Sequence, residues 1–310
     1  MNREHLLRLR DGREVAVCES GAPRGDAIIE CHGNPGSRIS PLCSDATARA
    51  LDIRWLTFDR PGIGPSSRSQ GHRTVCDVVG EVEEICDALD MAEFSILGYS
   101  AGGPYAAACA HGMGSRVRAL GLLSATPRLD GPNGMAALGR GAYWRLAVRV
   151  PQVSRAIYRS LGTLARHAPA VLAHLTKDGC SAPERRILAD PLKVERLVAV
   201  LAEATRQGPG GLVDDMRTLA RPWGFDPGEI TTPAIIWQGD EDSFVDQTAG
   251  AWWADVLPTA RSRALPGEGH FLPDTLIEEL MKELKSLAAE GLSLHAKEVG
   301  EPPREAREGE

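Results

Sequence analysis

Short apolar runs that end near glycine-rich turns, with helix-like stretches between them, limit what this chain can fold into. They lie at residues 27–33, 53–62, 94–100, 117–125 and 233–240. Residues 75–90 have the three-to-four spacing of an amphipathic helix, and small residues follow the third run. Strands that alternate with helices need crossover connections, so the sequence predicts an α/β fold with a parallel sheet. A ligand site is then expected at the carboxyl ends of the strands.

The pattern changes between residues 131 and 225. Strand-like runs disappear there, and helical stretches are interrupted by proline and glycine. We interpret residues 1–130 and 226–292 as one α/β core and residues 131–225 as a helical insertion over its sheet. Residues 293–310 are polar and contain prolines, which predicts a polar C-terminal tail.

Composition excludes several classes of protein. The chain has 310 residues and a net charge of -7, with no dense basic run, so neither nucleic acid nor anionic lipid is an expected partner. No apolar run is long enough to span a membrane, and the first residues are charged. The seven cysteines form no CxxC pair. We therefore expect a cytoplasmic protein with free thiols that needs no metal or cofactor.

The stretch Gly98-Tyr99-Ser100-Ala101-Gly102 follows an apolar strand and opens a small-residue helix. A tight strand-to-helix turn requires glycine on both sides of the serine, and it holds the hydroxyl above the sheet edge. The helix N-terminus behind it favours negative charge. Ser100 is therefore predicted to be a nucleophile.

A serine hydroxyl needs a base, and the base needs a carboxylate that orients it. His270 lies in a glycine-flanked loop and is the predicted base. Asp242 is the preferred carboxylate because it lies far enough into its loop to reach a histidine. Asp240 follows a glycine directly and suits the turn better, and Asp130, after an earlier strand, is a third candidate.

Acyl transfer also needs hydrogen-bond donors for the developing oxyanion. The N–H of Ala101, just after the nucleophile, is one predicted donor. The second is the backbone N–H of Asn34, in the loop HGNPGSR at residues 32–38, with a further contribution from its side-chain amide.

Several motifs occur in an order that resembles the α/β-hydrolase superfamily. They are HGNPGSR, DRPGIGPS at 59–66, GYSAGG, GDED, GEGHF and PWGF at 222–225. The resemblance implies the α/β-hydrolase fold: an eight-stranded, mostly parallel sheet flanked by helices, with an α-helical cap between strands six and seven. Epoxide hydrolases and haloalkane dehalogenases use an aspartate where this chain has Ser100, so both are set aside.

The main functional hypothesis is a serine hydrolase that cleaves an ester, thioester or lactone-like bond of a small molecule. A cyclase, lyase or acyltransferase of small-molecule biosynthesis on the same fold is the second hypothesis, and a non-catalytic ligand-binding protein is the third. Tyr99, Tyr143 and Trp144 are predicted to contact the substrate, although aromatic residues in the insertion also fit a role as its core. The chain is expected to be a monomer or a homodimer.

Overall fold

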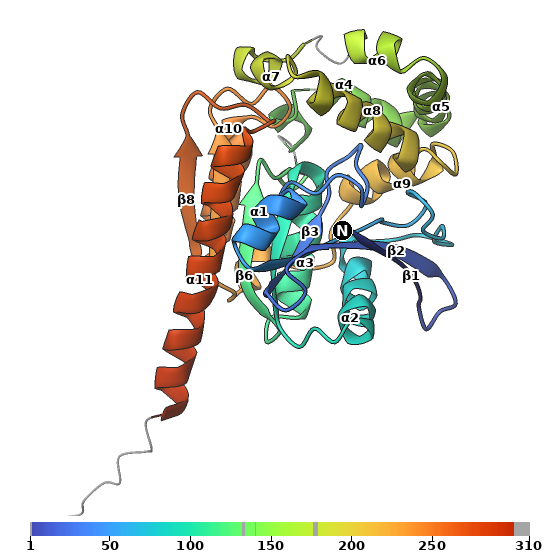
Figure 1. Ribbon diagram of the computed structural model, residues 1–310. Helices are drawn as coiled ribbons and strands as arrows, with labels where there is room; N and C mark the ends of the chain where they lie inside the picture. The colour runs from blue at the N-terminus through green and yellow to red at the C-terminus, as the bar shows by residue number, and fades with distance from the viewer. Residues whose placement is uncertain (1, 132–133, 140, 176–178, 301–310) are drawn as a thin grey trace, which may run out of the picture.

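The computed structural model describes residues 2–131, 134–139, 141–175 and 179–300. Its centre is an eight-stranded sheet in the order β1-β2-β4-β3-β5-β6-β7-β8 (Figure 1). The strands are β1 (Arg3–Arg8), β2 (Glu14–Gly21), β3 (Asp26–Cys31), β4 (Ile53–Phe58), β5 (Phe94–Tyr99), β6 (Val117–Leu123), β7 (Ala234–Gly239) and β8 (Ala260–Leu265). The strands from β4 to β8 in this order pair in parallel, which confirms the predicted sheet.

An antiparallel hairpin at the N-terminus, β1 and β2, is the part of the sheet that periodicity did not indicate. Leu9 donates its N–H to the Arg13 carbonyl at 2.8 Å, and Gly12 between them has φ +86°. Charged side chains along β1 suit an exposed edge strand, because they hinder pairing with another chain. They also hide the apolar alternation by which strands are detected.

Helices cover both faces of the sheet. On one face α2 (Val78–Ala88), α3 (Gly103–Gly112) and α10 (Gln247–Val256) contribute to one apolar cluster. On the other face α1 (Asp45–Ala50) and α11 (Asp274–Gly300) pack on a second cluster. The α11 helix reaches Gly300, so residues 293–300 of the predicted tail are helical. Leu, Ala, Lys and Glu in this stretch favour helix continuation up to the glycine. Residues 301–310 of that tail lie outside the described residues.

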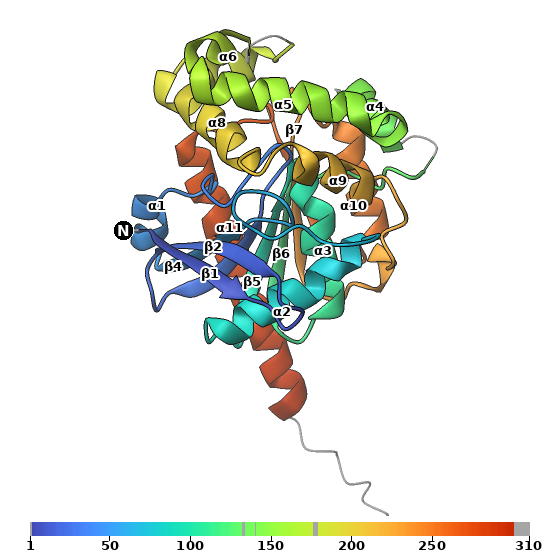
Figure 2. The same cartoon turned by 90° about the vertical axis from the view of Figure 1, so that its right-hand side faces the viewer.

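In the described part of the segment between β6 and β7, six helices lie over the carboxyl ends of the strands, and we call them the cap (Figures 1 and 2). They are α4 (Gly141–Arg149), α5 (Pro151–His167), α6 (Pro169–Leu175), α7 (Ala182–Ile187), α8 (Pro191–Ala204) and α9 (Gly210–Leu219). Their bounds fall inside the predicted insertion at 131–225. The cap has an apolar cluster of its own, which includes Ile63 from the loop after β4. Within the described residues, every helix is too short or too polar to cross a bilayer.

Candidate active site

Ser100 lies where β5 turns abruptly into α3. Its φ is +54°, a strained value for a residue with a side chain, and residues 100–102 form a single 3-10 turn. A Cβ on Gly98 would lie 2.5 Å from the Gly103 Cα, and one on Gly102 would lie 1.8 Å from the Cys31 carbonyl oxygen. Both glycines are therefore sterically required, as we expected for a tight strand-to-helix turn around Ser100. The serine is 8% exposed at the carboxyl end of the sheet.

His270 and Asp242 form a buried pair in the loops after β8 and β7. The His270 Nδ1 lies 2.9 Å and 3.1 Å from the two carboxylate oxygens of Asp242. The backbone N–H groups of Phe244 and Val245 donate to Asp242 at 2.8 Å and 2.9 Å. Burial raises the pKa of Asp242, but His270 and these hydrogen bonds outweigh burial and hold the pKa below its usual value. The carboxylate is thus kept ionised beside the imidazole.

The other two candidate carboxylates have different partners. Asp240 accepts a hydrogen bond from the Gly267 N–H at 2.7 Å and so supports the turn, the role expected for it. Asp130 pairs with Arg128, two residues away, at 2.7 Å. The geometry therefore favours Asp242 as the partner of His270.

Tyr99 connects the serine turn to the histidine loop. Its hydroxyl donates to the backbone carbonyl of His270 at 2.9 Å, and the two rings are 5.0 Å apart between centroids. The Tyr99 hydroxyl thus holds the histidine loop, and a contact of its ring with substrate stays a prediction. Among the described residues no hydrogen bond joins Ser100 to His270 directly. Such bonds are often long without substrate and shorten in the complex.

Asn34 belongs to a loop that borders the serine. A Cβ on the neighbouring Gly33 would lie 3.6 Å from the Ser100 Oγ. The Asn34 side-chain amide donates to the Leu212 carbonyl at 3.0 Å and to Asp215 at 2.8 Å. Both N–H groups of this side-chain amide are therefore engaged within the protein, and the oxyanion role expected of Asn34 stays a prediction for its backbone N–H. For the backbone N–H groups of Asn34 and Ala101, the described part of the chain shows no acceptor.

A buried ion pair fixes that loop to the cap, and the sequence did not indicate it. Arg60 donates Nε and Nη2 to the two oxygens of Asp215 on α9 at 2.8 Å and 2.9 Å, and Nη1 to the His32 carbonyl at 2.6 Å. The Tyr105 hydroxyl donates to Asp215 at 2.7 Å. Burial raises the pKa of Asp215, but Arg60 and the hydrogen bonds outweigh it, so the pKa stays below its usual value. Asp215 thereby links α9, Arg60 and Asn34.

Glu184, on α7 of the cap, is a second residue that the sequence did not single out. It is fully buried, and its Oε1 accepts from the backbone N–H of His270 at 3.0 Å and of Ser243 at 2.9 Å. Its Oε2 accepts from the Ser181 N–H at 2.7 Å and from the Ser243 hydroxyl. One cap carboxylate therefore holds both the loop of Asp242 and the loop of His270. Ser181 and Glu184 have the spacing of a helix capping box, which indicates a helix start but not this tertiary contact.

The two predicted cap contacts with substrate are not supported by their positions. Tyr143 is 52% exposed and lies on the surface of the cap. Trp144 is 8% exposed and belongs to the apolar cluster that also contains Val213 and Met216 of α9. Trp144 is therefore cap core, the alternative noted for these aromatics. Besides Tyr99, the rings of Phe244 and Phe271 flank His270, with centroids 4.9 Å and 5.7 Å from the imidazole.

Known proteins share this architecture. A Bacillus subtilis (strain 168) protein that carries the name 2-succinyl-6-hydroxy-2,4-cyclohexadiene-1-carboxylate synthase is 32% identical over 125 residues, 40% of this chain and 45% of that protein. The dihydrolipoyllysine-residue acetyltransferase component of the acetoin cleaving system of Pseudomonas putida is 24% identical over 279 residues, 88% of this chain and 66% of that protein. The chain thus spans less than two thirds of the length of each of these relatives.

Solved structures agree in fold. An alpha/beta hydrolase fold protein from Nakamurella multipartita superposes with a TM-score of 0.67 at 23% identity, covering 93% of this chain and 100% of that one. An esterase from Rhodococcus sp. ECU1013 gives a TM-score of 0.68 at 19% identity, covering 92% and 99%. The sequence pattern that defines the alpha/beta hydrolase fold matches residues 26–275. Because that match spans most of the chain, and the eight-stranded, mostly parallel sheet agrees with it, this protein belongs to the alpha/beta hydrolase fold family.

Proposed function

We propose that this protein is a serine hydrolase that cleaves an ester, thioester or lactone-like bond of a small organic molecule. The observation that carries the proposal is the buried Asp242–His270 pair, whose loop is tied through Tyr99 to the strained turn at Ser100. Nucleophile, base and orienting carboxylate follow three different strands. Each follows the carboxyl end of its strand, on the side of the sheet that the cap covers.

In this mechanism the Ser100 Oγ attacks the acyl carbon while the His270 Nε2 accepts the hydroxyl proton. The tetrahedral intermediate collapses, and His270 gives that proton to the departing alcohol or thiol. Water then attacks the acyl-enzyme with His270 as base, which releases the acid and restores Ser100. Asp242 orients the imidazole and stabilises its charged form. The N–H groups of Asn34 and Ala101 are assigned to the oxyanion, where one donor contributes about 2.7 to 4 kcal/mol.

A synthase or lyase reaction is the second candidate, favoured by the similarity to the Bacillus subtilis protein. In that reaction Ser100 binds or protonates the substrate and is not acylated. Ser100→Ala would then keep part of the turnover, while His270→Ala would lose it. A non-catalytic binding protein would bind a ligand without consuming it, and it would have no need for the buried Asp242–His270 pair.

Labelling by a fluorophosphonate probe tests the proposal without knowledge of the substrate. We expect intact mass to show one adduct on the wild-type chain and none on Ser100→Ala, because an activated serine with oxyanion donors is required. Ser69→Ala, which removes a half-buried serine whose hydroxyl contacts only the Gln70 carbonyl among the described residues, should label like wild type. An unlabelled wild-type chain, or an adduct that persists in Ser100→Ala, would show that Ser100 is not the nucleophile.

Glu184 holds the loops after β7 and β8 in place and has no direct part in the proposed reaction. Its substitution is therefore expected to change the rate of Ser100 labelling only by shifting these two loops. Glu184→Ala leaves the His270 and Ser243 N–H groups without their acceptor, and a displacement of about 1 Å at a catalytic group typically costs on the order of 100-fold in rate. Glu184→Gln keeps an oxygen for these N–H groups and should recover most of the labelling rate. Exposed Glu195, on α8 of the same cap, provides the control Glu195→Ala, which should change nothing. If Glu184→Ala labelled at the wild-type rate, this positioning role would be refuted.

A further inference from the structure

A cavity of about 180 Å³ lies apart from the catalytic residues, between the segment after β4 and the outer part of α9. Figure 2 shows this segment passing in front of α3 and below α9. Neither Ser100, Asp242 nor His270 lines the cavity. Its lining includes five arginines: Arg60, Arg68, Arg73, Arg217 and Arg221. His72 is also part of the wall, and the acidic residues in the lining are Asp214 and Asp215.

The carboxylates near this cavity are shared among more arginines than they can neutralise. Asp215 is taken by buried Arg60. Asp214 accepts from Arg68 at 2.6 Å and from Arg155, outside the cavity, at 2.8 Å. The local balance of charge is therefore positive.

Arg73, also in the lining, has a carboxylate partner. It donates to Glu81 at 2.7 Å, and Arg13 donates to the same carboxylate oxygen. Because Arg13 also pairs with Asp11 at 2.6 Å, two carboxylates balance these two guanidinium groups. Arg73 therefore contributes hydrogen-bond donors to the cavity rather than uncompensated charge.

Two further arginines have no carboxylate at all among the described residues. Arg217 is partly buried and shows no hydrogen bond or ion pair there. Arg221 donates to the Nδ1 of His72 at 3.0 Å, so its partner is an imidazole ring rather than a carboxylate. The dipole of α9 stabilises cations near its last turn, but it does not account for the convergence of Arg68 and Arg73 from a different segment.

This excess of positive charge stands out in a chain whose net charge is -7. A concave site lined by one sign of charge concentrates the opposite sign, and the planar guanidinium fork matches the oxygens of a phosphate group. A volume of about 180 Å³ accommodates such a group together with part of the molecule that carries it.

We propose that this cavity, lined by Arg68, Arg73, Arg217 and Arg221, is a binding site for a small phosphate-bearing anion. The anion supplies the negative charge that the surrounding carboxylates do not. Asp215 borders the site and also accepts a hydrogen bond from Asn34. Asp215 therefore connects a bound anion to the loop beside Ser100. The site does not depend on the hydrolase reaction, because it uses none of the residues assigned to that chemistry.

Calorimetric titration of the full chain with inorganic pyrophosphate, at ionic strength held constant with sodium chloride, tests the site. We expect saturable binding of about one pyrophosphate per chain and a higher Tm in its presence. The double variant Arg217→Gln/Arg221→Gln should bind at least about tenfold more weakly, since it removes two charges and their charge-assisted hydrogen bonds to the anion. The affinity of Arg217→Lys for pyrophosphate should lie between that of wild type and that of the double variant, because lysine keeps the charge but lacks the planar set of guanidinium donors.

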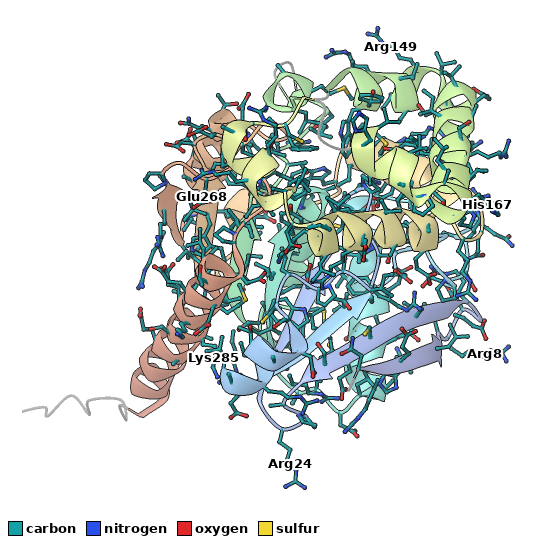
Figure 3. The ribbon with its side chains drawn as sticks, turned by 45° about the horizontal axis from the view of Figure 1, so that its top comes forward. Arg8, Arg24, Arg149, His167, Glu268 and Lys285 are labelled. Atoms are coloured by element: carbon teal, nitrogen blue, oxygen red, sulfur yellow. The ribbon has the colours of Figure 1, made fainter. Side chains whose placement is uncertain are left out.

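The matched control is Arg8→Gln/Arg149→Gln, which removes the same charge from exposed positions on β1 and α4, far apart at the surface in Figure 3. It should bind pyrophosphate like wild type. Three results would overturn the proposal: no binding beyond that of chloride, unchanged affinity in the Arg217/Arg221 variant, or an equal loss in the control. Stronger binding of malonate than of pyrophosphate would overturn the assignment to phosphate.

Discussion

Replacing Asp242 with asparagine is expected to lower the rate of Ser100 labelling, and of p-nitrophenyl acetate hydrolysis, by about four orders of magnitude. Asparagine has nearly the same shape and keeps an oxygen for the Phe244 and Val245 N–H groups that Asp242 now binds. It loses the negative charge, however, and its amide favours the wrong tautomer of His270. The effect should therefore appear in the chemical step, with little change in the urea midpoint of unfolding.

Asp240→Asn is the matched control for that measurement. Asp240 is two residues away in the same loop and accepts a hydrogen bond from the Gly267 N–H, which an asparagine oxygen can still accept. Its labelling rate should stay within about twofold of wild type, because surface substitutions away from special features change little. A rate that fell in Asp240→Asn and not in Asp242→Asn would assign the orienting carboxylate to Asp240.

The parts of the fold that follow from local pattern were predictable from the sequence. The parallel strands carry apolar runs because both of their faces are buried, and the turn at Ser100 is marked by two glycines that backbone contacts require. The order of Ser100, Asp242 and His270 along the chain then restricted the candidate site to few residues. The hairpin of β1 and β2 was not predictable from periodicity, because its edge strand carries charged residues.

The residues that hold the site together were not predictable in this way. Glu184 and Asp215 are charged residues on cap helices, and in sequence they look like solvent-exposed helix positions. Each is buried only because a distant loop supplies its partners, His270 for Glu184 and Arg60 for Asp215. Trp144 shows the reverse difficulty, since aromatic character alone does not distinguish a contact with substrate from a packing contact.

Asp215→Ala is expected to lower the free energy of unfolding by about 3 to 5 kcal/mol, because it leaves the Arg60 charge buried without a counter-ion. The side chains of Arg60 and Asp215 are 2% and 4% exposed. The same substitution removes the acceptor of the Tyr105 hydroxyl and of the Asn34 amide, so the loop beside Ser100 should loosen as well. Urea denaturation measures the first effect, and the labelling rate of Ser100 measures the second.

The adjacent residue on α9 provides the control, because it is charged, ion-paired and solvent-accessible. The Asp214 side chain is 41% exposed and pairs with Arg68 and Arg155, so Asp214→Ala should cost less than about 1 kcal/mol. If burial of an uncompensated charge is the cause, the double variant Arg60→Met/Asp215→Leu should be more stable than Asp215→Ala, although the His32 carbonyl still loses its donor. Equal costs for Asp214→Ala and Asp215→Ala, or no recovery in the double variant, would contradict that cause. A labelling rate unchanged in a folded Asp215→Ala chain would show that the ion pair stabilises the cap without positioning Asn34.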